Sequence, residues 1–103
     1  MSSKYHCFCK NSVAVVNAKF RAFDSSGQKG KKIELPTGGE GQLALLEPAG
    51  NIIKIEYWDV DWQDRGCFGP VNSGDEIVID GSLSGFKVTI NGNSANTVPC
   101  PGS

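Results

Sequence analysis

Only one histidine and one methionine occur among the 103 residues, and no apolar run approaches the roughly 20 residues that a membrane span needs. The charges nearly cancel, since ten basic and eleven acidic residues give a net charge of −1. A chain with this balance has no overall field to attract a nucleic acid or an anionic membrane surface. The glycine-rich stretch 37–41 lacks the lysine-containing pattern of a phosphate-binding loop. These absences predict no membrane span, no nucleic-acid partner and no phosphate cradle.

The length of the chain predicts a single domain that covers residues 1–103. A domain of this size buries roughly two-thirds of its unfolded-chain surface at best, so covalent cross-links help it to stay folded. Met1–Ser3 leads directly into Lys4 without the pattern of a signal peptide. If the protein is secreted, we therefore expect this sequence to be the mature form with a short added start.

Four cysteines, an even number in a short chain with 13 glycines, favour a disulfide-bonded, secreted protein. A bond between Cys7 and Cys9 would close a tight, strained ring, so we expect each to bond with one of Cys67 and Cys100. Of the two remaining pairings we prefer Cys7–Cys100 with Cys9–Cys67, because the first bond would clamp the two chain ends. Each bond would stabilise the fold by roughly 4 kcal/mol in the chain-entropy model. A zinc site is disfavoured because the chain contains no C-x2-C knuckle.

Residues 51–69, NIIKIEYWDVDWQDRGCFG, hold both tryptophans and form the most informative stretch. The stretch opens as a strand, with alternating apolar residues from Ile53 to Tyr57 on one face. After Tyr57 the apolar residues change parity, because Trp58 and Trp62 now alternate with aspartates. Either a β-bulge near Tyr57–Trp58 absorbs the change, or the strand ends there and the rest is a binding loop.

Short strands separated by turn signals are predicted for much of the remaining chain, at residues 13–24, 33–35, 42–47, 76–80, 86–90 and 93–98. The turn Pro48–Asn51 predicts a hairpin over residues 42–57, and the Asn-Gly pair at 91–92 predicts another. The only basic cluster lies at residues 29–32 and is expected at a solvated hairpin tip.

These elements predict an all-β fold, a small antiparallel β-sandwich or barrel of six to seven strands stapled by two disulfides. The alternative is an α+β fold with a helix at residues 13–23, because Val13, Val16 and Phe20 also fall on one side of a helix. Ser12 could cap the N-terminus of that helix.

Asp59, Asp61 and Asp64 are the candidate metal ligands. Aspartates at positions i and i+2 of a strand project to one side, and a third from the following loop could join them around a calcium ion. The segment EYWDVDWQDRGCFG resembles the aspartate-bearing loop of C2 domains, which implies calcium at these three residues. The alternative is that the aspartates are solvated or pair with Lys54 or Arg65, and that the protein has no cofactor.

The tryptophans of the same segment are candidates for binding a partner. A tryptophan beside carboxylates can stack on a sugar ring or anchor a protein interface. One of the two is expected in the core, and Trp62 is the better candidate for exposure. The candidate binding residues are Trp58, Asp59, Asp61, Trp62, Asp64 and Arg65.

Catalysis is the less favoured interpretation. Asp59 and Asp64 could act as the acid and base of a small hydrolase. The chain offers no Ser/His/Asp set, however, since its one histidine lies beside Cys7. A sandwich of this size also rarely has room for a catalytic cleft. We therefore expect a protein that is not an enzyme.

The two ends of the chain resemble small secreted fungal effectors. A cysteine before the first strand and the ending GFKVTINGNSANTVPC are similar to the ToxB-like group of plant-pathogen effectors, which are six-stranded sandwiches stapled by disulfides. The start Tyr5-His6-Cys7 also resembles the Y-x-C start of the RNase-like effectors of mildew fungi, whose fold would make residues 13–23 a helix. The resemblance implies a secreted, extracellular effector that binds a host protein. A lectin-like or calcium-dependent carbohydrate-binding module, with a glycan as partner, is the alternative.

Overall fold

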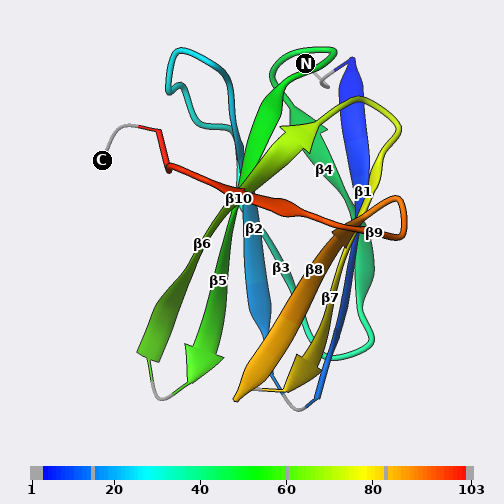
Figure 1. The fold of residues 1–103 in the computed structure, drawn as a ribbon, viewed down its shortest axis with the longest axis vertical. Coiled ribbons are helices and arrows are strands. Elements are labelled where there is room, and N and C mark those ends of the chain that lie inside the picture. Colours follow the sequence, from blue (N-terminus) through cyan, green and yellow to red (C-terminus); the bar gives the residue numbers. More distant parts are fainter. Residues whose placement is uncertain (1–3, 15, 60, 83, 102–103) are drawn as a thin grey trace.

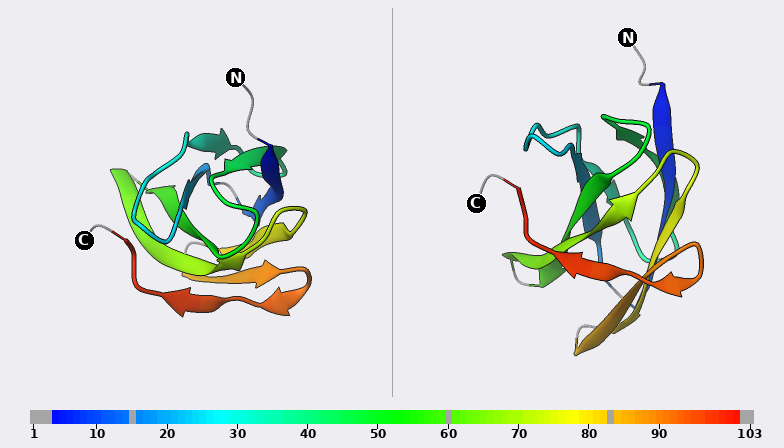
Figure 2. Two further views of the ribbon diagram at one scale, coloured as in Figure 1. Left: turned by 90° about the horizontal axis from the view of Figure 1, so that it is seen from above. Right: turned by 45° about the horizontal axis from the view of Figure 1, so that its top comes forward.

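Two five-stranded sheets pack face to face in the computed structural model, which describes residues 4–14, 16–59, 61–82 and 84–101 and leaves the side chain of Asp59 undescribed (Figure 1). Sheet A has the order β4-β1-β7-β8-β9, and sheet B has the order β10-β6-β5-β2-β3. The strands are β1 (Tyr5–Val13), β2 (Ala18–Phe23), β3 (Ile33–Leu35), β4 (Glu40–Leu45), β5 (Asn51–Asp59), β6 (Asp61–Val71), β7 (Glu76–Ser82), β8 (Gly85–Ile90), β9 (Asn93–Ser94) and β10 (Asn96–Val98). Seen from above in Figure 2, the strands enclose the core almost as a barrel does.

The prediction of an all-β sandwich is confirmed, although ten strands are present rather than six to seven. The helix considered for residues 13–23 was wrong, because β1 ends at Val13 and β2 covers Ala18–Phe23. Alternation decides the outcome in β2, where Ala18, Phe20 and Ala22 are fully buried while the residues between them face outward. The described residues include no helix that is long and apolar enough to cross a membrane.

The core lies between the sheets and is built from the inward-facing residues of both. Its largest fully buried side chains include Phe20, Leu43 and Tyr57. Ile53, Ile55 and Tyr57 all point into it, which confirms the face predicted for the start of the central stretch.

The predicted hairpin over residues 42–57 was wrong, although both of its strands exist. β4 pairs with β1 in sheet A, whereas β5 pairs with β2 and β6 in sheet B. The intervening residues carry the chain from one sheet to the other, and the buried Asn51 side chain holds this junction. Its Oδ1 accepts hydrogen bonds from the amides of Leu46 (3.2 Å) and Glu47 (3.1 Å). Its Nδ2 donates to the carbonyls of Glu47 (2.9 Å) and Val71 (3.0 Å).

β1 was not predicted from the sequence, yet it lies inside sheet A, antiparallel to β4 and parallel to β7. Its inward row contains a polar residue, Asn11, which conceals the apolar alternation. Asn11 is fully buried because its hydrogen bonds are satisfied: its Nδ2 donates to the carbonyls of Val16 (2.8 Å) and Leu35 (2.9 Å). Its Oδ1 accepts from the amide of Val13 at 3.0 Å.

The predicted disulfide pairing was also wrong. Cys67 bonds with Cys100, with 5.3 Å between their Cα atoms, while Cys7 and Cys9 are buried free thiols. The sheets explain the difference. Cys7 and Cys9 point into the core from β1 of sheet A, whereas Cys67 lies opposite the outward-facing Lys54 on sheet B. No N-terminal cysteine can reach Cys67 through the packed core.

We expect thiol titration of the unreduced protein to give two free thiols after denaturation and none in the native state. Burial covers both sulfur atoms, and the hydrogen bond with Cys7, together with burial, raises the pKa of Cys9 far above its ordinary value. A thiol that remains protonated and covered reacts slowly. Ellman's reagent with and without guanidinium makes the measurement. Two thiols reacting at once in the native protein, or none in the denatured one, would contradict the structure.

Candidate functional site

The β5–β6 hairpin carries both tryptophans and explains the change of parity in the central stretch. β5 continues regularly through Tyr57 and Trp58, and Asp59 pairs with Asp61 at the end of the hairpin. Trp58 lies directly opposite Trp62, so both indoles are on the outer face of sheet B. The bulge predicted near Tyr57–Trp58 was therefore wrong, as was the alternative of a loop after Tyr57, because the chain reverses and continues as a strand.

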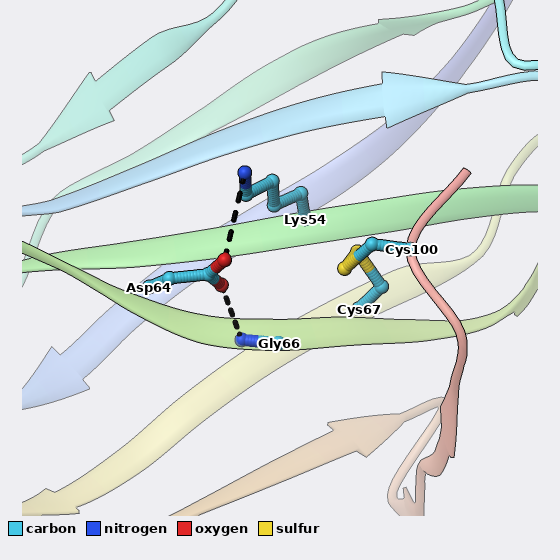
Figure 3. Close-up of a disulfide and its surroundings, with 5 residues drawn as sticks. All are labelled: Lys54, Asp64, Gly66, Cys67 and Cys100. Atoms are coloured by element: carbon cyan, nitrogen blue, oxygen red, sulfur yellow. Dashed lines mark hydrogen bonds and ion pairs between the residues drawn. A yellow bond between two sulfur atoms is a disulfide. The ribbon is translucent and has the colours of Figure 1, made fainter. Parts of the chain in front are cut away.

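The register between β5 and β6 shifts at two places, and both extra residues are on the returning strand β6. Lys54 pairs with Cys67 and Glu56 pairs with Asp64, so two residues of β6, Arg65 and Gly66, lie opposite one residue of β5. Gly66 has φ of 100°, a conformation that favours glycine, and its amide donates to Asp64 Oδ1 at 2.8 Å. The extra residue places Asp64 and Cys67 on the same outer face, although they are three positions apart. Figure 3 shows them side by side, with Cys100 reaching Cys67 from the C-terminal segment.

The tryptophan face, which we define as Trp58, Trp62 and Lys19, lies near the hairpin end of sheet B. The two indoles meet edge to face, with 5.4 Å between ring centroids. Lys19 Nζ lies 3.8 Å from the Trp62 centroid, which is close enough for a cation–π interaction. Trp58 is 47% exposed, and Trp62 is partly covered. Neither is in the core, contrary to the prediction for one of them, and Trp58 rather than Trp62 is the more exposed.

The structure separates the other candidate residues of the segment. Asp61 is exposed at the hairpin end, where its Oδ1 accepts a hydrogen bond from the Trp62 amide at 2.8 Å. Asp64 forms an ion pair with Lys54 at 3.6 Å. Arg65 does not join the tryptophans, because its Cζ lies 5.1 Å from the centroid of the buried Tyr57 ring. Asp59 ends β5, and its side chain is outside the described part of the chain.

The expected calcium site requires several carboxylates to lie close together. Within the part of the chain that the structure describes, no group of three or more His, Cys, Asp or Glu side chains could hold a metal ion. Asp64 already has a lysine and an amide as partners.

A hollow of about 610 Å³ lies beside the tryptophan face, over the outer side of sheet B. We call it the basic hollow, because four of its lining residues are basic and two are acidic. The basic residues are Arg21, Lys29, Lys32 and Lys54, and the acidic residues are Glu56 and Asp64. The disulfide residue Cys100 and its neighbour Pro101 line it as well, so the cross-link fixes part of its rim.

Two ion pairs neutralise half of the basic charge in the hollow. Lys32 Nζ lies 3.4 Å from Glu56 Oε1, and Lys54 pairs with Asp64 as already described. Among the described residues, Arg21 and Lys29 have no ion-pair partner, and the buried Arg21 Nε has no hydrogen-bond acceptor. The hollow thus carries an excess of positive charge in a chain whose net charge is −1.

The loop after β2 brings Lys29 to the hollow, and Asp24 determines its shape. Asp24 Oδ1 accepts hydrogen bonds from the Ser26 hydroxyl (2.8 Å), the Ser26 amide (2.9 Å) and the Gln28 amide (2.9 Å). The Ser26 hydroxyl contributes most to a pKa of Asp24 below its ordinary value of 3.8. Gly30 N then donates to the Ala22 carbonyl at 2.9 Å, which returns the loop to the sheet.

Sequence reasoning missed the basic hollow, because its residues come from four separate places in the chain. Alternation within each strand places Lys19 and Arg21 on one face of β2 and Lys54 on the outer face of β5. Only the antiparallel pairing of β2 with β5, which sets Arg21 opposite Lys54, brings them together. Comparisons of the chain with protein-family models, with curated proteins and with solved structures find no match.

Proposed function

We propose that this protein is a secreted, disulfide-bonded binding protein without catalytic activity, and that it contacts its partner through the outer face of sheet B. The observation that carries the proposal is the tryptophan face. Trp58 is 47% exposed and packs edge to face on Trp62, which in turn lies against Lys19, and a large exposed indole held in this way is a typical anchor of a binding site.

The edges of the two sheets are less suitable for binding a partner than this face is. A partner strand that extends a sheet needs a long free edge. Three of the four edge strands are only two or three residues long: β3, β9 and β10. A face that presents aromatic and charged side chains therefore suits binding better than an edge.

A host molecule is the partner that we favour. The resemblance of the chain ends to small secreted fungal effectors supports this choice, and the Cys67–Cys100 disulfide supports an oxidising, extracellular compartment. A host protein was the first expectation from the sequence, and a glycan was the alternative. The basic hollow beside the tryptophans is the specific observation in favour of a glycan.

We expect Trp58→Ala to weaken partner binding by roughly 30-fold or more, which corresponds to the 2 kcal/mol typical of an interface anchor. The melting temperature should change little, because about half of the side chain is already in water. The measurement is binding of the labelled protein to a glycan array, with and without calcium, and to host extracellular proteins.

Phe8→Ala is the matched control. Phe8 is 46% exposed, nearly the same as Trp58, but it lies on β1 of sheet A. Its removal should leave binding unchanged. If Trp58→Ala binds as the wild type does, or if Phe8→Ala loses as much affinity, the tryptophan face is not the site. Turnover of ester, glycoside or RNA substrates by the wild type would contradict a non-catalytic role.

A further inference from the structure

We propose that the partner of sheet B is an acidic oligosaccharide, one of whose sulfate or carboxylate groups enters the basic hollow while a sugar ring stacks on Trp58. This inference rests on the binding role proposed above and names the class of ligand. It draws on three features of the face: its rows of side chains, its unpaired cations and its exposed indole.

The outer face of sheet B is organised in rows, since residues opposite one another on neighbouring strands lie side by side. The first row is aromatic and contains Trp58 and Trp62. The second row is Lys19, Glu56 and Asp64, which lie opposite one another on β2, β5 and β6.

The third row of the same face sets Arg21 opposite Lys54, whose other neighbour is Cys67. Lys54 and Trp58 are four residues apart on β5, so the aromatic and basic rows are about 13 Å apart at about 3.3 Å per residue. A ligand that reaches both rows must therefore be elongated.

The basic row selects an anion. Arg21 and Lys29 line the hollow without an ion-pair partner among the described residues. A sulfate or carboxylate group in the hollow supplies the missing negative charge and can accept charge-assisted hydrogen bonds from these cations.

The middle row decides between an acidic glycan and a single-stranded nucleic acid. Aromatic and basic side chains together also suit a nucleic acid. Glu56 and Asp64, however, lie between the aromatic and basic rows, where their ion pairs with lysines leave little positive charge for a regular phosphate backbone. A sugar presents hydroxyl groups there, which can donate hydrogen bonds to the carboxylates. A chain that alternates hydroxyls with isolated acidic groups fits all three rows.

The size of the hollow is consistent with such a ligand. At about 610 Å³ it lies within the roughly 300–1,000 Å³ typical of small-molecule sites, which is more than a lone inorganic anion needs. Phe23 and Pro101 add apolar surface to its lining, against which the carbon face of a sugar can pack.

The test is a titration of the protein with four short probes, with binding measured by calorimetry and by tryptophan fluorescence. The probes are a heparin-derived tetrasaccharide, a tetragalacturonate, the neutral tetrasaccharide cellotetraose and a DNA tetranucleotide. We expect one or both acidic sugars to bind and to change the tryptophan fluorescence, and we expect the binding to weaken as salt is added. Binding of the tetragalacturonate would show that a carboxylate suffices, whereas binding of the heparin tetrasaccharide alone, which carries sulfates as well as carboxylates, would show that sulfate is required. Tighter binding of the tetranucleotide, or equal binding of cellotetraose, would overturn the inference.

Lys29→Gln tests the hollow itself, and Lys31→Gln is the matched control. Both residues are exposed in the same loop and lose the same charge, but only Lys29 lines the hollow. Lys29→Gln should reduce the association constant for the acidic sugar roughly tenfold, as expected for a charged hydrogen bond. Lys31→Gln should change it less than about twofold, because a screened surface charge contributes little. Equal effects of the two variants would mean that the sugar responds only to overall charge, and the hollow would not be its site.

Arg21→Gln and Trp58→Ala distinguish failure of this inference from failure of the proposed function. Arg21→Gln should also weaken binding of the acidic sugar, and its melting temperature checks that the variant is folded. If Trp58→Ala loses partner binding while Lys29→Gln and Arg21→Gln do not, the tryptophan face stands and the acidic ligand is wrong. If the two charge variants lose binding while Trp58→Ala does not, the hollow stands and the tryptophan anchor is wrong.

Discussion

Replacing Asn51 by alanine should lower the free energy of unfolding by about 4 kcal/mol or more, the largest loss that we expect from a single polar residue. Its fully buried side chain makes four hydrogen bonds with the backbone where the chain crosses between the sheets. The substitution removes the side-chain partner of two amides and two carbonyls at that junction, and each buried group left unpaired costs about 1–3 kcal/mol. Urea denaturation followed by tryptophan fluorescence measures the change.

Asn93→Ala is the control for this substitution, because Asn93 is an exposed residue of the short edge strand β9. It should change stability by less than about 0.5 kcal/mol, as surface substitutions usually do. A loss of only about 1 kcal/mol in Asn51→Ala would show that water replaces the side chain at the junction. In that case the crossing between sheets would not depend on Asn51.

Tyr57→Ala should lower the free energy of unfolding by roughly 3–5 kcal/mol, whereas Tyr57→Phe should leave it equal or raise it by about 1 kcal/mol. The ring is fully buried and meets Phe86 edge to face at 4.9 Å, so its loss leaves a large cavity. The hydroxyl, by contrast, is buried with no hydrogen-bond partner among the described residues. Removing a buried group of this kind avoids a desolvation cost.

The pH dependence of stability separates the hydroxyl from the ring. Burial raises the pKa of Tyr57 above its ordinary value of 10.0, although Arg65 acts in the opposite direction. The folded protein therefore keeps the phenol protonated after the unfolded chain has begun to ionise. The stability that this provides is complete below pH 10 and is lost as the pH rises above it. Between pH 9 and pH 11, the free energy of unfolding should therefore fall less for Tyr57→Phe than for the wild type. Equal decreases in the two proteins would mean that the hydroxyl is solvated.

Local alternation was enough to predict part of this fold. The row from Ile53 to Tyr57, the buried face of β2 and the strands near 76–80 and 86–90 are present because apolar residues at every second position need one buried face. β1 was not predicted because the polar Asn11 interrupts its apolar row. The Asn11 side chain can be buried only because distant backbone groups, such as the Leu35 carbonyl, form hydrogen bonds with it. A local sequence pattern indicates which side of a strand is apolar, but it does not indicate which strand lies next to it.

The same limit applies to the candidate site. The two tryptophans and the aspartates lie close together in sequence, so the sequence alone drew attention to them. Whether Trp58 faces water or the core depends on the hairpin that sets it opposite Trp62. The basic hollow depends on the pairing of β2 with β5, on a loop shaped by Asp24 and on a disulfide at the chain end. These are long-range relations, and no short window of sequence contains them.

The position of β1 has a consequence for how the protein acquires its structure. Although it is the first strand in the chain, its parallel neighbour β7 lies more than 60 residues later, from Glu76 to Ser82. Sheet A can therefore close only after most of the chain has left the ribosome. Contacts over such distances fold slowly, and until they form, Cys7 and Cys9 remain open to oxidation and to exchange with the two other cysteines. Refolding in the presence of an oxidant should thus produce mispaired disulfides, and a thiol reductant present early should increase the yield of the native form.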